Sequence, residues 1–302
     1  NTIKIDEIRK LWFAIVLVVS AISTSFSQGQ SFSRNYDFGL IDIGYALETT
    51  VDSGFILCGS TFAHGNYDLL LVRTDKNGDT VWARTYGDSL NDQGYAIQKT
   101  SDGNFLVSGT KESATTGFPD AWLLKIDANG DTIWTTNHGG HDSEWGYSVV
   151  ETADSGFVVV GASDTYGFAT NPNGNQRHGS PKVLALKIDA QGDSVWRKTY
   201  GVAEEESIDI GRDVVALDDG GFMICGQTGE GTFIEYDAYV IRLDENGDSL
   251  WTKTYGGQLD DEAYSIAATN DGFVLCGSSQ DFNTGNWELY LLKIDSAGSL
   301  LW

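Results

Sequence analysis

The sequence predicts an all-β protein, a β-propeller of four-stranded antiparallel blades with five blades in the 302 residues. Three observations predict this fold. A unit of roughly 50 residues recurs five times, each unit holds four short strand-like segments, and Asx and Gly turns separate the segments. None of the segments spaces its apolar residues at helical intervals. A four-stranded unit of this size cannot bury both of its faces alone, so successive copies must stack face to face.

A tryptophan marks the last strand of each unit. Its positions are Trp82, Trp134, Trp196, Trp251 and Trp302. Phe32 takes the equivalent place before the first unit, since residues 32–36 (FSRNY) parallel residues 82–86 (WARTY). The predicted propeller therefore covers residues 28–302, with repeats at approximately 32–81, 82–133, 134–195, 196–250 and 251–302.

The second repeat illustrates the four strands. They are expected at 94–97, 104–107, 121–124 and 132–134. Asp102-Gly103 separates the first two strands and Asn129-Gly130-Asp131 the last two, and such residues supply the positive φ of tight hairpins. A β-solenoid is the alternative way to stack repeats. Its coils are usually shorter and paired in parallel, so the hairpin-linked units favour a propeller.

Two patterns resemble known propeller families. Residues 125–134 (KIDANGDTIW) are similar to the tryptophan-docking motif of quinoprotein-like propellers, in which an outer-strand Trp packs on the neighbouring blade. A longer pattern resembles the bacterial extracytoplasmic beta-propeller repeats of the SBBP type; it runs through Tyr86-Gly87, Gly94-Tyr95, Asp102-Gly103-Asn104, Gly109-Thr110 and the span from Asp120 to Asp127. The resemblance covers about residues 32–302. It implies the fold more than the function, because propellers carry many unrelated activities.

Residues 1–27 have the features of a secretory signal peptide. Lys4, Arg9 and Lys10 precede an apolar run from 11 to 22, and Ser25 and Ser27 are small residues that suit a signal peptidase. A run of about a dozen apolar residues is shorter than the roughly 20 that span a bilayer. We therefore expect a secreted or extracytoplasmic protein, in the periplasm, at the cell surface or outside the cell, with no stable membrane insertion after cleavage.

Both ends of the sequence suggest a longer gene product. There is no initiator Met, and residue 302 falls inside the last strand of the fifth repeat. We expect a fragment of a larger propeller with further blades. The alternative is closure with five blades, in which the strand at 31–36 completes the last blade.

The charge of the chain argues against nucleic acid as a partner. Its 43 acidic and 19 basic side chains give a net charge of -24, which repels a phosphate backbone. The three cysteines, Cys58, Cys225 and Cys276, occupy one equivalent position in three repeats, so they are predicted to be small buried fillers and not a disulfide framework. We expect a monomer.

An acidic residue precedes the first strand of every repeat. The five are Asp42, Asp92, Glu144, Asp209 and Asp261. In a propeller this position lies where the loop enters the central channel, so the acids can form a ring for Ca²⁺ or a cationic ligand. The alternative, which the repetition favours, is that each acid fixes its own loop or pairs with a base of the neighbouring blade. No other cofactor is expected.

The third strand of every repeat carries a base followed two positions later by an aspartate. The pairs are Arg73 and Asp75, Lys125 and Asp127, Lys187 and Asp189, Arg242 and Asp244, and Lys293 and Asp295. Both members share a strand face. We expect them to form ion pairs between blades and to cap turns.

No nucleophile and base can be identified from sequence spacing, and no glycine-rich phosphate loop is present. His138 and His141 have a spacing that can begin a zinc site. However, His138 stands where other repeats have Tyr86, Tyr200 and Tyr255, so a packing role is predicted for it. Acids are so numerous that a catalytic carboxylate pair cannot be singled out.

The loops between the second and third strands differ most between repeats. They hold nine aromatic residues: Phe62, Tyr67, Phe118, Tyr166, Phe168, Phe233, Tyr236, Phe282 and Trp287. Such side chains can stack on sugars or anchor a protein, or they can tuck inward to hold the loops. The sequence-based hypothesis is a secreted non-catalytic module that binds or scaffolds an extracellular protein or glycan. The alternatives are a propeller enzyme, either a quinoprotein-like dehydrogenase or a glycan hydrolase or lyase, and an architectural spacer.

Overall fold

The computed structural model describes residues 33–63, 65–164, 169–170, 176–177, 180–201, 207–230, 235–281 and 283–302. The predicted signal peptide lies outside these residues. The chain divides into two units, Asn1–Asn35 and Tyr36–Trp302, and the fold below is that of the second unit. Among the described residues, no helical segment has the length and apolar character to cross a membrane.

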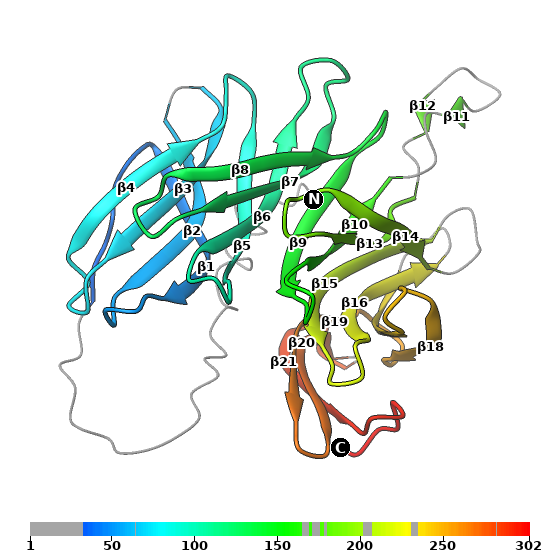
Figure 1. The fold of residues 1–302 in the computed structure, drawn as a ribbon. Coiled ribbons are helices and arrows are strands. Elements are labelled where there is room, and N and C mark those ends of the chain that lie inside the picture. The colour runs from blue at the N-terminus through cyan, green and yellow to red at the C-terminus, as the bar shows by residue number, and fades with distance from the viewer. Residues whose placement is uncertain are drawn as a thin grey trace. The chain divides into compact units, whose positions relative to one another are not determined.

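The main sheets of the second unit are five antiparallel blades of three or four strands (Figure 1). Each blade takes three strands from one predicted repeat, and blades 1–4 add the tryptophan-bearing strand at the start of the next repeat. Blade 1 contains β1 (Ile41–Thr49), β2 (Phe55–Phe62), β3 (Tyr67–Thr74) and β4 (Thr80–Tyr86). Blade 2 contains β5 (Asp92–Lys99), β6 (Phe105–Glu112), β7 (Pro119–Ile126) and β8 (Thr132–His138). Blade 3 contains β9 (Glu144–Glu151), β10 (Phe157–Ser163), β13 (Lys182–Ile188) and β14 (Ser194–Tyr200).

Blade 4 contains β15 (Ile208–Ala216), β16 (Phe222–Glu230), β17 (Glu235–Leu243) and β18 (Ser249–Tyr255), and blade 5 contains β19 (Asp261–Thr269), β20 (Gly272–Gln280) and β21 (Trp287–Ile294). The segment after β21 begins to pair with it, through a bridge between Ile294 and Leu300. A two-stranded hairpin of β11 (Ala169–Thr170) and β12 (Gln176–Arg177) interrupts blade 3. Each blade pairs its strands in chain order, which confirms the predicted all-β, propeller-type fold.

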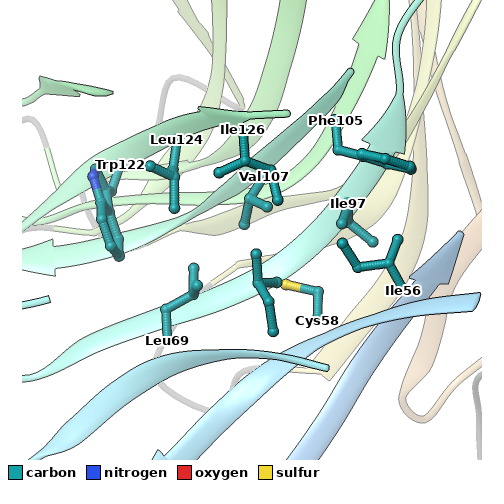
Figure 2. Packing of buried hydrophobic residues seen from close by; sticks show 10 residues of the cluster. Ile56, Cys58, Leu69, Ile97, Phe105, Val107, Trp122, Leu124 and Ile126 are labelled. Carbon is teal, nitrogen blue, oxygen red and sulfur yellow. The ribbon is translucent and has the colours of Figure 1, made fainter. Parts of the chain in front are cut away.

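Successive blades pack face to face through apolar side chains. Between blades 1 and 2, Cys58, Leu69 and Leu71 of one sheet meet Ile97, Val107 and Leu124 of the next (Figure 2). Equivalent clusters join blades 2 and 3, blades 3 and 4, and blades 4 and 5. The stacking predicted from the repeat is therefore the main source of the core.

The outer strands of blades 1–4 dock on the turn between the last two strands of the following blade. Trp196 lies against Gly247, which has a φ of 76°, and a Cβ on this glycine would lie only 2.8 Å from the indole. The hydroxyl of Tyr200 donates to the carbonyl of Gly247 at 2.6 Å. His138 Nε2 lies 3.1 Å from the carbonyl of Gly192 in the same arrangement, which gives this histidine the place of a packing tyrosine.

The bases of the third strands pair with a different partner from the one expected. Each base contacts the aspartate in the first turn of its own blade, at 2.8 Å or less; the pairs are Arg73–Asp52, Lys125–Asp102, Lys187–Asp154, Arg242–Asp219 and Lys293–Asp271. The aspartates two positions after the bases instead cap their own turns: Asp127 Oδ1 accepts from the amides of Asn129 and Asp131 at 2.8 and 2.9 Å. The reason is that both hairpin turns lie at the same end of a blade, so the base reaches the nearer turn.

The ion pair between Lys187 and Asp154 should make the free energy of unfolding depend on pH in the acid range. Hydrogen bonds from Lys187 and Thr152 lower the pKa of Asp154 to about 2. A lowered carboxyl pKa stabilises the fold above the ordinary pKa near 4, and this contribution disappears as the pH falls towards 2. Because Asp154 is well exposed, we expect Asp154→Asn to cost no more than about 1 kcal/mol at pH 6 and nothing near pH 2. Urea unfolding of both proteins at the two pH values measures this, and an equal difference at both would contradict it.

Candidate functional site

The five acids that precede the inner strands occupy equivalent places. Each lies across from a hydroxyl or an amine on the second strand of its blade; the pairs are Asp42 and Thr61, Asp92 and Lys111, Glu144 and Ser163, Asp209 and Thr228, and Asp261 and Ser279. The acids also bind local groups: Asp92 accepts from the amide of Asp88 at 2.7 Å, and Asp261 from the amide of Gly257 at 2.7 Å. Within the described ranges, no three His, Cys, Asp or Glu side chains are placed to hold a metal ion. A cation ring stays a prediction.

A second carboxyl group from the preceding blade comes close to several of these acids. At the junction of blades 4 and 5, a Cβ on Gly256 would overlap Asp237 and lie 2.9 Å from Asp261. Asp68 and Asp92 flank Gly87 in the same way. At these two junctions the glycine before the inner strand thus leaves space in which carboxyl groups from adjacent blades come close. At the junction of blades 3 and 4 the second acid is replaced by Lys182, which forms a 2.8 Å ion pair with Asp209.

The junction of blades 2 and 3 departs from this pattern. Its two acids are Asp120, on β7, and Glu144, which begins β9 and is 2% exposed. Arg197 of β14 donates to Glu144 Oε1 at 2.6 Å and to Ser163 Oγ at 3.0 Å. The equivalent positions in blades 1, 2 and 4 hold Ala83, Thr135 and Thr252, so the arginine departs from the repeat. We call Asp120, Glu144, Ser163 and Arg197 the junction cluster.

Both carboxyl groups of the junction cluster have altered acidity. Burial raises the pKa of Glu144, against the lowering effect of Arg197, and the charge of Asp120 raises it further. Burial also raises the pKa of Asp120, and the charge of Arg197 opposes this. Among the described residues, Asp120 Oδ1 and Glu144 Oε2 are buried oxygens that accept no hydrogen bond. The cluster therefore offers two carboxyl oxygens with unused acceptor capacity.

This arrangement is suited to proton transfer. A carboxyl group with a raised pKa keeps its proton nearer to neutral pH, and a second carboxylate held by an arginine remains ionised. Two such groups in one cluster can act as a general acid and a general base. Arg197 fixes the position of Glu144 through a charge-assisted hydrogen bond.

A second group of side chains on the inner strands was missed by the sequence analysis. Each inner strand has a bulge, and the bulged residues are Tyr45, Tyr95, Tyr147, Arg212 and Tyr264. They stack on one another across the blades: the ring centroids of Tyr45 and Tyr95 are 5.4 Å apart, those of Tyr95 and Tyr147 are 5.3 Å apart, and Arg212 lies 5.2 Å from the ring of Tyr147. Bulges re-aim side chains. The sequence shows this stack as a residue three positions after each blade acid, which is tyrosine in blades 1, 2, 3 and 5 and Arg212 in blade 4.

The stack ends in a polar network in blades 4 and 5. Arg212 Nη2 donates to Gln227 Oε1 at 3.1 Å, and Gln227 Nε2 donates to Glu262 Oε1 at 3.2 Å. The hydroxyl of Tyr264 also donates to Glu262. Arg212 and Gln227 belong to blade 4 and Glu262 to blade 5, so the hydrogen bond from Gln227 to Glu262 joins the two blades.

The aromatic residues predicted on the loop face have different surroundings. Phe62 and Tyr67 pack edge to face, with ring centroids 5.0 Å apart. Trp287 is 39% exposed, while Phe118 and Tyr236 are half-buried. The remaining four, Tyr166, Phe168, Phe233 and Phe282, lie outside the described residues. Among the five that are described, the structure brings Phe62 and Tyr67 into contact.

Comparison with known proteins gives a fold and no family. No protein-family model matches the chain. The regulatory protein FlaEY of Caulobacter vibrioides is 26% identical over 214 residues, which are 63% of this chain and 22% of that protein. The match thus spans about a fifth of the length of this relative.

The similar solved structures include a protein of unknown function from Bacteroides caccae, with a TM-score of 0.55, 14% identity, and coverage of 88% of this chain and 83% of that one. They also include the mannose phosphorylase MPT-4 of Leishmania mexicana, with a TM-score of 0.44, 11% identity, and coverage of 86% and 87%. A third belongs to the GH130 family of mannoside phosphorylases and hydrolases that target mannosidic linkages in Candida mannan, with a TM-score of 0.41, 8% identity, and coverage of 85% of both chains.

These comparisons correct the functional hypothesis drawn from the sequence. Two of these structures are described as mannoside phosphorylases or hydrolases, so the sequence-based hypothesis of a non-catalytic binding module is not carried further, and the propeller enzyme that was its alternative is taken up below only as a proposal. At these identities the likeness concerns the fold. The chemistry has to be argued from the residues of this chain.

Proposed function

We propose that this chain is a propeller enzyme that hydrolyses glycosidic bonds, with Asp120 and Glu144 as its acid–base pair. One observation carries the proposal: the buried Glu144 and the half-buried Asp120 come from adjacent blades, both have a raised pKa, and both lie near Arg197, whose position holds Ala83, Thr135 and Thr252 in blades 1, 2 and 4. Glycoside hydrolysis by most enzymes requires two carboxyl groups in different protonation states on either side of the bond.

The contacts assign a role to each carboxyl group. Arg197 and Ser163 both bind Glu144 Oε1, which favours the ionised form of Glu144 as the general base. Asp120 Oδ1 has no such donor, so Asp120 is the group that holds the proton. In the reaction Asp120 gives its proton to the leaving glycosidic oxygen as the bond from that oxygen to the sugar carbon breaks. Glu144 takes a proton from the water whose oxygen bonds to the same carbon.

The same proposal includes the setting of the enzyme. We infer that the repeats are of the SBBP type, that residues 1–27 direct export, and that the substrate is an extracellular glycan. The supporting features are the repeat pattern, the basic and apolar start of the chain, and the acidic composition. The proposed chemistry uses carboxyl groups alone and involves no redox cofactor.

The proposal is tested with the purified chain and a panel of aryl glycosides and polysaccharides, by measuring release of the aryl group and of reducing ends. We expect turnover of at least one glycoside class by the wild-type protein and loss of that turnover in Asp120→Asn. The matched control is Asp68→Asn, because Asp68 is the equivalent acid of blade 1 and the blade that follows it has Thr135 in place of Arg197. Absence of turnover with the whole panel, or equal turnover in wild type and Asp120→Asn, would overturn the proposal.

Replacing Arg197 should change the pH dependence of this activity. Its hydrogen bond and charge lower the pKa of Glu144. The variant Arg197→Gln lacks this positive charge. We therefore expect it to raise the pKa of Glu144 further, because the charge of Arg197 no longer offsets the effect of burial. Since the base must be ionised, the acid limb of the pH–rate profile should move to higher pH. A limb that stays in place, or moves to lower pH, would contradict the role of Arg197.

A further inference from the structure

Arg212 is the member of the inner-strand stack that departs from the repeat, because the other four blades place a tyrosine at this position. Its guanidinium lies 5.2 Å from the ring of Tyr147 and 5.8 Å from the ring of Tyr264. The Nε and Nη2 atoms of Arg212 donate to Gln227 Oε1 at 3.3 and 3.1 Å. Gln227 is 3% exposed, so one buried side chain and two rings hold the planar guanidinium in a fixed orientation.

This guanidinium has donors that the protein does not use. Among the described residues, Arg212 forms no salt bridge and its Nη1 atom donates no hydrogen bond. The side chain is partly exposed, as are those of Tyr147 and Tyr264 on either side of it. Hydrogen bonds from a charged donor are stronger than those from a neutral one. Arg212 therefore offers a positioned, charged donor to a ligand.

Acceptors lie beside this donor. Glu262 accepts from Gln227 Nε2 at 3.2 Å with Oε1, and from the hydroxyl of Tyr264 with Oε2. A carboxylate has about four acceptor positions, so about two remain for a ligand. Burial raises the pKa of Tyr236 on β17, the charge of Glu262 raises it further and the charge of Arg212 opposes this, so the Tyr236 hydroxyl lies near both charges.

We define the inner-strand site as these six side chains: Tyr147, Arg212, Gln227, Tyr236, Glu262 and Tyr264. They come from blades 3, 4 and 5, and the inner strands of these blades, β9, β15 and β19, contact one another in that order. The site thus combines a charged donor, a carboxylate acceptor and tyrosine rings.

We propose that the inner-strand site binds an uncharged sugar residue of the glycan substrate, with sugar hydroxyls accepting from Arg212 and donating to Glu262. The inference rests on the proposed function and names its substrate class. A donor and an acceptor side by side match neighbouring hydroxyl groups of a sugar, because each hydroxyl both donates and accepts. The tyrosine rings supply apolar contact for the C–H groups of the sugar ring and keep a polar tip for its hydroxyls.

The charges around the site favour an uncharged sugar over an acidic or a basic one. A carboxylate or sulfate on the sugar would be attracted by Arg212 but repelled by Glu262, and an ammonium group would meet the reverse. The chain as a whole repels anions through its net charge of -24. A neutral sugar satisfies both side chains without either conflict.

The inner-strand site lies on the same strand as the junction cluster. Tyr147 follows Glu144 by three residues on β9, which corresponds to about 10 Å along the strand. An oligosaccharide can extend over such a distance. The site therefore holds a sugar residue away from the bond that is cleaved.

The test is isothermal titration calorimetry on the chain with Glu144→Gln, which prevents turnover of the probes. The probes are linear hexasaccharides of glucose, mannose, xylose and galactose, with a hexasaccharide of galacturonate for comparison. We expect at least one neutral probe to bind. Adding Arg212→Tyr restores the residue of the other four blades, so the stack should persist while the affinity falls about 10-fold or more, as expected for loss of a charge-assisted hydrogen bond.

Two further variants complete the design. Glu262→Gln removes the charged acceptor and should also weaken binding, and it decides the question if Arg212→Tyr does not fold. Arg84→Gln changes an arginine of the outer strand β4 whose side chain is 40% exposed, and it should bind like the parent chain. Circular dichroism and thermal melting verify that each variant is folded.

Three results would overturn the inference: binding of none of the neutral probes, tighter binding of the galacturonate probe than of every neutral one, or unchanged affinity in both Arg212→Tyr and Glu262→Gln. These outcomes differ from those that test the proposed function. Binding that depends on Arg212, without turnover by the wild-type chain, overturns the proposed function alone. Turnover of a neutral glycan that Arg212→Tyr leaves unaltered overturns this inference alone.

Discussion

Replacing Asp213 with alanine is expected to lower the free energy of unfolding by about 3 kcal/mol. The carboxylate of Asp213 on β15 joins three blades. It accepts hydrogen bonds from the hydroxyl of Ser148 in blade 3 at 2.8 Å and from the hydroxyl of Ser265 in blade 5 at 2.8 Å, and the amide of Ile266 adds a third at 3.0 Å. The alanine would leave these donors without an acceptor at the packed inner strands, where unsatisfied polar groups are costly.

Equilibrium unfolding in urea measures this loss, with Asp218→Ala as the control. Asp218 is an exposed aspartate in the turn after β15, and its replacement should change the stability by no more than about 0.5 kcal/mol. Burial raises the pKa of Asp213 while its hydrogen bonds oppose that effect, so Asp213→Asn tests whether acceptor atoms or charge matter. Equal stabilities for Asp213→Ala and Asp218→Ala would show that Asp213 does not tie the blades together.

Replacing Glu144 with glutamine is expected to reduce glycoside hydrolysis by a factor of about 100 to 10,000, the range typical for loss of a general base. The glutamine keeps the size of the side chain and can still accept from Arg197 and Ser163. It cannot take a proton from water. The fold should therefore survive, and the loss should appear in kcat.

The repeat supplies a matched control for this variant. Asp92 begins the inner strand of blade 2 as Glu144 begins that of blade 3; it binds the amide of Asp88, and its blade has Thr135 in place of Arg197. Asp92→Asn should reduce activity little. If both variants lose activity in proportion to a loss of stability, the acids serve only to build blades, and the assignment of Glu144 would be wrong.

The fold could be predicted from the sequence because its elements are local. Hairpins join neighbouring strands, and residues such as Gly130, with a φ of 83°, mark the turns. The strands extend further than predicted: 94–97 became Asp92–Lys99, since polar residues at the strand ends still pair with the neighbouring strand. The inner-strand stack was missed because a bulge at Tyr95 changes the alternation of side chains, and no period in the sequence shows where a bulge lies.

The candidate site could be predicted only in part. Glu144 was singled out only as one of five repeated acids that could form a cation ring, and its proximity to Asp120 depends on the packing of one blade on the next. The sequence separation of these two acids gives no distance. Arg197 was not recognised, although its departure from Ala83, Thr135 and Thr252 at the same position was visible in the aligned repeats. Departures from a repeat at positions that face a junction are therefore the features to examine first.

The central claim is that the junction cluster holds two carboxyl groups poised for proton transfer. It is tested most directly by carbon-13 NMR titration of the side-chain carboxyls in labelled protein, with signals assigned through Asp120→Asn and Glu144→Gln. The account predicts that Asp120 titrates above its ordinary value of 3.8 and Glu144 above 4.5. If both groups titrate at or below these values, neither pKa is raised by burial, and the central claim is contradicted.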